Sequence, residues 1–401
     1  MISHLPDCKV ALGGDGGDEL FGGYHVGIDA SRNRSGGARA HITGILTEGN
    51  PIKYGIREVH VWAYRSLLDS IPDRPWLIKH SPKELEQKLG KQLLWQATKL
   101  SKEVVAAGCN ILFTTDASTL CRFRPMVVMN QDMLSYEPRV MRNYRFTRAR
   151  LRLLTILIVQ NQAMRFADGV IFLTRYAAQV IQHKTGKLNR IAIIPHGVDL
   201  AFKRNPLVRP WPREKGHPIH CLYVSNIDMY KHQWEVVQAI TKLRNRGHDI
   251  NLVLAGGGSG RAQQILDDEI SVSDPQRLFV EDRGFVKHDE LPSLLSNANL
   301  FVFASSCENF PVTLLEAMTT GLPIACSNRG PMPEVLADGG VYFDPENSDS
   351  IADAVEQLIT NASLREKVAR RAKTLSEQYS WSRCANETWA FIVDTYRSIK
   401  A

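Results

Sequence analysis

The sequence predicts an α/β fold made of two doubly wound domains, and three observations lead to that prediction. Short apolar runs, which suit buried parallel strands, alternate with helical stretches along most of the chain. A proline-rich, charged segment at 206–218 separates two halves that share this alternation. The stretch 299–334 gives one complete unit of strand, polar turn and helix. Ligands of such sheets bind at the carboxyl ends of the strands, so we expect a site in the polar turns.

Composition limits the classes of protein that this chain can belong to. Of the 401 residues, 44% are hydrophobic and 23% are charged, as in ordinary globular proteins. The formal net charge of +7 favours anionic partners: phosphate-bearing substrates, an anionic membrane surface or nucleic acid. The seven cysteines are odd in number and scattered, so we expect a reducing cytoplasm and no structural metal site. We expect no secretory signal and no membrane span, because no window approaches ~20 apolar residues.

The first 24 residues stand apart from both halves. Residues 9–24 read K-V-A-L-G-G-D-G-G-D-E-L-F-G-G-Y and resemble the ATP-dependent synthetase domain of the asparagine synthetase family. The pyrophosphate-binding loop and the amidotransferase half of that family are missing. We therefore interpret 1–24 as a fusion remnant or an over-extended start and not as an independent domain. Synthetase activity is an alternative that we do not expect.

The first domain is predicted to span 25–205. A strand at 25–29 and a helix from about 38 to 46 flank a turn that contains Gly36 and Gly37. A glycine pair there lets the backbone approach a phosphate without a Cβ clash, although a plain turn explains it equally well. Further strands are predicted at 58–63, 110–114, 126–130, 170–173 and 190–195.

An arginine-rich segment lies within this first domain. Arg139 to Arg152 holds six arginines and no acid, and three of the arginines share helical spacing. The segment can form a solvated face, dock onto an anionic membrane, or bind an anionic glycan or lipid diphosphate. We expect no nucleic-acid binding, because no recognition module accompanies the run.

The second domain is predicted to span 219–380, and a last helix over 381–401 is expected to cross back to the first domain. A strand at 219–224 leads through a polar turn with Asn226 and Lys231 into a helix. Downstream, a strand runs into a glycine turn that includes Gly256, and another ends at Val286. A closing strand at 339–345 precedes helices at about 349–360 and 363–378.

Residues 299–334 contain the candidate site. A buried strand over 300–304 leads into a polar turn and then into a helix that Pro311 can start and Gly321 can end. The helix N-terminus offers free N–H groups and a partial positive charge, which suit a phosphate. Glu308 precedes that point, and Glu316 lies about 7–8 Å deeper at ~1.5 Å rise per residue. One acid on each side suits a diphosphate with a sugar on one side and a ribose on the other.

This stretch resembles the E-x7-E motif of the retaining glycosyltransferases of the GT-B fold, the large family called family 4 or group 1. Glu308 and Glu316 match its two acids, and Glu-Ala-Met and Gly-Leu-Pro follow as in the family. The resemblance covers about 25–397 and implies two Rossmann-like domains that face a cleft. It further implies transfer of a hexose from a UDP- or GDP-sugar, with retention, to a glycan or lipid-linked acceptor. Cell-surface polysaccharide assembly is then the expected role, on the cytoplasmic side, without a bound metal or cofactor.

The same resemblance assigns roles to single residues. Lys231 would hold the diphosphate and Glu308 the hexose hydroxyls, as the catalytic pair, while Glu316 would bind the ribose. Asn226 stands where the family has an arginine, so a catalytically weakened sugar-nucleotide-binding protein is the alternative. The acceptor-side candidates are Asp132 and Glu137, which could be ordinary loop acids, and His196, which could only cap its turn. The other donor-side positions are Gly36, Gly37, Gly256, Val286, Asn309, Phe310 and Val312.

Overall fold

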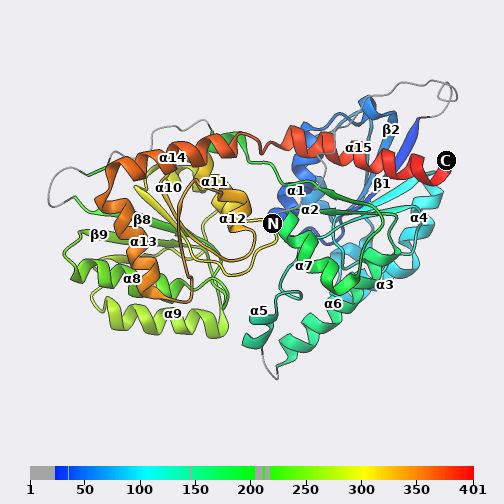
Figure 1. The fold of residues 1–401 in the computed structure, drawn as a ribbon. Coiled ribbons are helices and arrows are strands. Elements are labelled where there is room, and N and C mark those ends of the chain that lie inside the picture. The colour runs from blue at the N-terminus through cyan, green and yellow to red at the C-terminus, as the bar shows by residue number, and fades with distance from the viewer. Residues whose placement is uncertain (1–22, 35, 145–146, 204–210, 213–216) are drawn as a thin grey trace.

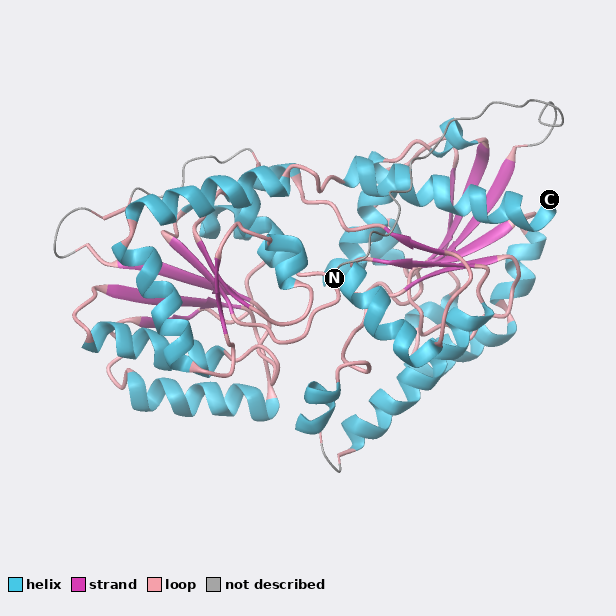
Figure 2. Ribbon diagram, viewed as in Figure 1, coloured by secondary structure: helices cyan, strands magenta, loops and turns pink. Residues whose placement is uncertain are grey.

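The molecule has two lobes, each a parallel sheet with helices on both faces (Figure 1, Figure 2). This computed structural model describes residues 23–34, 36–144, 147–203, 211–212 and 217–401. The N-terminal lobe holds a seven-stranded sheet and the C-terminal lobe a six-stranded sheet. The predicted α/β class with two doubly wound domains is confirmed. The fragment 1–22 and most of the 206–218 linker lie outside the described residues.

The N-terminal sheet has the strand order β3-β2-β1-β4-β5-β6-β7, and its paired strands are parallel. Strand β3 is not evident from the sequence, because it is a short, only partly buried edge strand. The strands are β1 (Tyr24–Asp29), β2 (Ile56–Trp62), β3 (Leu77–His80), β4 (Ile111–Thr114), β5 (Met126–Met129), β6 (Gly169–Phe172) and β7 (Ile191–Ile193).

Helices connect these strands and cover both faces of the sheet (Figure 2). They are α1 (Gly36–Glu48), α2 (Arg65–Leu68), α3 (Leu89–Thr98), α4 (Leu100–Ala106), α5 (Pro138–Asn143), α6 (Arg148–Phe166) and α7 (Arg175–Thr185). Short 3-10 turns are η1 (Pro51–Tyr54), η2 (Lys83–Glu86) and η3 (Leu200–Phe202).

The C-terminal sheet has the order β10-β9-β8-β11-β12-β13. The strand order reverses between β8 and β11, so the turns that follow these two strands diverge from a topological switch point, where open sheets bind ligands. The strands are β8 (Ile219–Val224), β9 (Ile250–Ala255), β10 (Val280–Asp282), β11 (Leu300–Phe303), β12 (Ile324–Ser327) and β13 (Val341–Phe343). The helices are α8 (Gln233–Asn245), α9 (Gly260–Ser273), η4 (His288–Glu290), α10 (Leu291–Ser296), α11 (Val312–Thr320), α12 (Met332–Leu336), α13 (Ser348–Thr360) and α14 (Ala362–Ser376).

The last helix, α15 (Trp381–Lys400), leaves the C-terminal lobe and lies along the N-terminal lobe, as the red helix in Figure 1 shows. Its first residue packs on α1 so closely that a Cβ at Gly44 would meet the Trp381 ring at 2.3 Å. Trp389, further along the helix, is fully buried. This apolar contact holds the end of the chain against the first lobe.

Two absences concern only the part of the chain that the structure describes. No helix there is both long and apolar enough to cross a membrane. The six cysteines there are all free, and all are buried.

Candidate functional site

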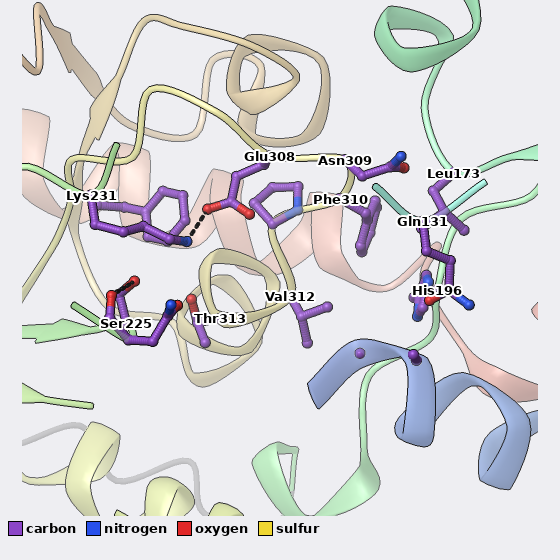
Figure 3. Close-up of a pocket in the computed structure, with 15 residues that line it drawn as sticks. Gln131, Leu173, His196, Ser225, Lys231, Glu308, Asn309, Phe310, Val312 and Thr313 are labelled. Carbon is purple, nitrogen blue, oxygen red and sulfur yellow. Dashed lines mark hydrogen bonds and ion pairs between the residues drawn. The ribbon is translucent and has the colours of Figure 1, made fainter. Parts of the chain in front are cut away.

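A cavity of about 400 Å³ lies where the two lobes meet (Figure 3). Both lobes contribute to its wall. The N-terminal lobe supplies the start of α1 and the turns after β5, β6 and β7, and the C-terminal lobe supplies the turns after β8 and β11 and the start of α11. The lining residues are Gly37, Ala38, Gln131, Leu173, His196, Ser225, Asn226, Lys231, Phe303, Glu308, Asn309, Phe310, Pro311, Val312 and Thr313.

The turns after β8 and β11 are fixed to one another by hydrogen bonds. The Ser306 N–H donates to the Tyr230 carbonyl at 2.8 Å, which joins the two turns. The Tyr223 hydroxyl of β8 donates to the Lys231 carbonyl at 2.7 Å, which holds the first turn to its own strand. His232 adopts a left-handed φ of 51° at the N-cap of α8. A left-handed φ is uncommon for a residue other than glycine. The His232 ring contacts the Ser306 hydroxyl at 2.9 Å.

Lys231 and Glu308 form an ion pair in the wall of the cavity (Figure 3). Their side chains are only 8% and 15% exposed. The Lys231 ammonium also lies over the rings of Tyr230 and Phe303, with its nitrogen 5.1 and 5.8 Å from the ring centres. Lys231 and Glu308, which are predicted from two different stretches of the sequence, are thus in direct contact. A fixed positive charge beside a cavity suits an anionic ligand.

The N-terminus of α11 also borders the cavity. The helix begins at Val312, one residue later than predicted, and Pro311 is its N-cap. The Val312 N–H donates to the Phe310 carbonyl at 3.0 Å. A ligand-binding role is predicted for the N–H groups around Val312, and in the structure the Val312 N–H itself has this backbone partner. Thr313 lines the cavity, and N–H groups in the first turn of a helix lack intrahelical partners.

Asn309 and Phe310 tie the two lobes together at the cavity. The Asn309 side-chain amide donates to Asn130 Oδ1 at 2.6 Å, and the Asn309 carbonyl accepts from the Thr174 hydroxyl at 3.1 Å. The Phe310 ring stacks on His196 with ring centres 5.6 Å apart. Both predicted donor-side residues therefore line the cavity and also join the lobes.

His196 lies in the wall and is almost fully buried. Its ring lies 5.0 Å from that of His41, centre to centre. Burial holds the pKa of His196 well below its ordinary value, and the repulsion that a protonated His41 would add lowers it further. Burial also lowers the pKa of His41 to about 3, so both rings are neutral at pH 7. His41 was not among the predicted site residues, although it is a histidine on the otherwise apolar face of α1.

The two acidic acceptor-side candidates do not line the cavity. Asp132 Oδ1 accepts from the Leu134 N–H at 3.0 Å, and burial raises the pKa of Asp132. Glu137 accepts a hydrogen bond from the Tyr176 hydroxyl. The neighbouring Gln131 does line the cavity, with its amide donating to the Thr115 carbonyl at 2.8 Å.

The predicted glycines differ in what they do. Gly37 lines the cavity, and a Cβ there would lie 3.5 Å from the Val312 side chain across the lobes. Gly36 starts α1 with a left-handed φ of 57° and has open space around it. Gly256 lies outside the cavity, and a Cβ there would meet the Ser225 carbonyl oxygen at 2.0 Å. Gly256 therefore supports the turn that presents Asn226.

Glu316 and Val286 lie outside the cavity that Glu308 lines. Glu316 is almost fully buried in α11, and its Oε1 contacts His288 Nε2 at 2.8 Å. Burial raises the pKa of Glu316, whereas its hydrogen bond to His288 raises the pKa of that imidazole. Val286 borders a second cavity of about 880 Å³ on the α10 side of the C-terminal lobe. The His288 partner is a contact that the sequence analysis misses.

No other arginine takes the place that Asn226 fills, among the residues the structure describes. Arg329 makes two hydrogen bonds of 2.9 Å to the Asp344 carboxylate, and Arg261 is exposed at the start of α9. Neither lines the cavity. Within the arginine-rich segment, Arg148 and Arg152 are exposed on α6.

Two stretches of the chain match known protein families. Residues 209–375 match the Glycosyl transferases group 1 family. Residues 2–107 match the Asparagine synthase family, so that similarity is wider than the run at 9–24 from which it was predicted. The O-antigen chain mannosyltransferase B of Escherichia coli is 37% identical over 105 residues, 26% of this chain and 28% of that protein. The D-inositol 3-phosphate glycosyltransferase of Paenarthrobacter aurescens is 30% identical over 234 residues, and the match spans 55% of each chain.

Solved structures with the same architecture cover nearly the whole chain. Sucrose-phosphate synthase from Thermosynechococcus elongatus superposes with a TM-score of 0.71 at 16% identity, over 94% of this chain and 99% of that one. Anabaena HepE in complex with UDP-glucose gives a TM-score of 0.67 at 18% identity, over 93% and 99%. The chain therefore has the GT-B fold, as predicted.

Proposed function

We propose that this protein is a retaining glycosyltransferase that moves a hexose from a UDP- or GDP-sugar to a glycan or lipid-linked acceptor. One observation carries the proposal: the cavity between the lobes joins a buried lysine, a carboxylate and a helix N-terminus, within a chain that matches the Glycosyl transferases group 1 family over 209–375. The names of the relatives support the same reaction class, since they include a mannosyltransferase and an inositol phosphate glycosyltransferase.

The donor diphosphate would bind between Lys231 and the start of α11. Negative charge grows on the diphosphate as the bond to the sugar breaks, and electrostatic stabilisation of that charge is the main catalytic contribution. The Lys231 ammonium and the N–H groups of the first turn of α11 would supply it, so the reaction needs no bound metal or cofactor. Glu308 would turn from Lys231 to the hexose hydroxyls, and the departing phosphate oxygen would accept the acceptor's proton.

Glu316 would bind the ribose, but its contact with His288 occupies part of its carboxylate. One carboxylate oxygen of Glu316 already contacts His288 Nε2. Ribose binding therefore requires either the second oxygen or movement of His288, whose side chain is 60% exposed. An exposed side chain can move at little cost in packing.

The acceptor side is proposed to face an anionic membrane through α5 and α6, at the cytoplasmic surface, in cell-surface polysaccharide assembly. Leu151, Leu154 and Ile158 are exposed on α6 at helical spacing, beside Arg148 and Arg152. An apolar stripe flanked by arginines suits an interfacial helix.

Vesicles with anionic lipid should sediment the wild type but not the double variant Leu151→Glu/Ile158→Glu. The control Val272→Glu, which replaces an exposed apolar side chain of α9, should still sediment with the vesicles. Equal vesicle binding by all three proteins would contradict the proposal.

A catalytically weakened sugar-nucleotide-binding protein is the second candidate. Asn226 lacks the two-pronged donor of arginine, and Arg329 is held by Asp344. A thermal-shift screen of UDP- and GDP-sugars identifies the donor, because a ligand that binds only the folded state raises its stability. Transfer of the labelled sugar to an acceptor supports the enzyme. Binding without transfer or hydrolysis supports the second candidate.

A synthetase activity follows only from the Asparagine synthase match at 2–107. The described part of that stretch forms β1 to β3 and the helices up to α4 of the N-terminal sheet. Deletion of residues 1–24 tests this alternative. We expect folding and donor binding to survive the deletion, and loss of both would show that the segment is needed.

A further inference from the structure

A cluster of two imidazoles and a carboxylate lies on the N-terminal sheet. His25 is on β1, and Glu58 and His60 are on β2, where the strand register pairs His25 with Glu58. Glu58 and His60 are two residues apart, so their side chains leave the same face of the strand. One ligand atom from each of the three residues lies within 4.8 Å of the other two. Nitrogen and carboxylate oxygen atoms that bind transition metals thus converge on one point.

The two nitrogen atoms at this point have no hydrogen-bond partner. His25 Nδ1 and His60 Nε2 are both buried, and neither makes a hydrogen bond. They lie 3.7 and 3.5 Å from Glu58 Oε2, beyond the ~2.7–3.2 Å of an ordinary N–H···O bond. Buried polar atoms normally have partners, so this pair of orphaned nitrogens indicates a group that belongs between them.

A further contact prepares His60 to act as a ligand. Its Nδ1 lies 3.0 Å from His80 Nε2 on β3, and the His80 ring in turn stacks on Trp62 at 4.6 Å between ring centres. When Nδ1 donates to His80, the lone pair of His60 Nε2 points to the cluster. Metal-binding histidines usually have such a partner on the other ring nitrogen.

We propose that His25, Glu58 and His60 bind a divalent transition-metal ion of the zinc class. Bonds of about 2.0–2.2 Å to zinc place tetrahedral ligand atoms about 3.3 Å apart. The observed separations of 3.7 and 3.5 Å from Glu58 therefore need to close by only a few tenths of an ångström. The fourth position is left for water. The His25 and Glu58 side chains are 28% and 35% exposed, which gives the ion a route from solvent.

The position of this site separates it from sugar transfer. His25 and Glu58 lie near the amino ends of β1 and β2, whereas the interdomain cavity is lined by turns beyond the carboxyl ends of strands. An ion here would join β1 to β2, with His80 extending the network to edge strand β3. The site therefore stabilises the N-terminal lobe and takes no part in the proposed transfer reaction.

Zinc titration of the full-length, tag-free, chelator-treated chain tests the site. We expect calorimetry to detect one equivalent of Zn²⁺ and the melting temperature to rise with ZnCl₂. Glu58→Gln and His25→Gln should abolish both effects. His80→Gln should weaken Zn²⁺ binding about 10- to 100-fold, as loss of a ligand's partner does. The control His183→Gln, at an exposed histidine of α7, should bind like the wild type.

Substitutions at the partly exposed His25 and Glu58 are expected to leave the protein folded, so a loss of Zn²⁺ binding can be assigned to the site. His25 and Glu58 are replaced in preference to buried His60, and each variant's melting temperature without metal shows that it folds. Equal Zn²⁺ binding by the wild type and folded Glu58→Gln would overturn the proposal. Absence of any stoichiometric binding by the wild type would overturn it as well. An anomalous peak at the zinc edge between His25 and His60 would support it directly.

Discussion

Replacing Glu308 with glutamine should tighten UDP binding and slow sugar transfer. The Glu308 carboxylate accepts a hydrogen bond from Lys231, and both side chains are largely buried. A donor diphosphate therefore competes with this carboxylate for the ammonium. A hydrogen bond to a charged group contributes about 1.5–3 kcal/mol. At about 1.4 kcal/mol for each factor of ten, release of Lys231 corresponds to about 10- to 100-fold in affinity.

Calorimetry with UDP measures this change directly. The dissociation constant should fall by about tenfold or more in Glu308→Gln. It should stay unchanged in Glu346→Gln, a control at an exposed acid of the same lobe that lines neither cavity. Transfer should slow in Glu308→Gln, because glutamine lacks the charge that holds the hexose hydroxyls. A folded Glu308→Gln protein with unchanged or weaker UDP binding would refute the competition between carboxylate and diphosphate.

Three further predictions concern charge, backbone and pH. Lys231→Ala should lower turnover by roughly 10²-fold or more, as loss of one oxyanion donor does, and an unchanged transfer rate would contradict its role. Gly256→Ala should impair folding, because its Cβ would meet the Ser225 carbonyl at 2.0 Å. In thermal melts the control Gly257→Ala, with contacts of 3.5 Å, should behave like the wild type. Glu316 raises the pKa of His288 above 6.5. The free energy of unfolding should therefore be lower in His288→Gln than in the wild type below that pH, and the difference should disappear as the pH rises through the folded-state pKa of His288. Denaturant unfolding at low and high pH checks this, and a pH-independent difference would contradict it.

The sequence predicts most of the sheet because strand and helix signals are local. Runs such as 219–224 and 300–304 are apolar and bounded by polar turns, and the observed strands begin at the predicted residues. Strand β3 is missed because its four residues form a partly buried edge. Glycine and proline mark the ends of α11 to within one residue, since both act on the local backbone.

The candidate site is only partly predictable, because side-chain pairing depends on residues that are distant in the sequence. Lys231 and Glu308 are each evident from a local motif, but their ion pair joins turns separated by 77 positions. The contact between His288 and Glu316 is hidden in the same way. The position of His41 beside the cavity depends on packing against β4, α15 and the turn after β7, which are distant in the sequence. Local patterns thus identify the residues, and only the packed fold identifies their partners.

A crystal structure of the protein soaked with UDP shows where the diphosphate binds. We expect diphosphate density in the interdomain cavity, within hydrogen-bond distance of the Lys231 ammonium and at the first turn of α11. Density elsewhere, such as in the second cavity beside α10, or an interdomain cavity that stays closed to a ligand that calorimetry shows to bind, would contradict it.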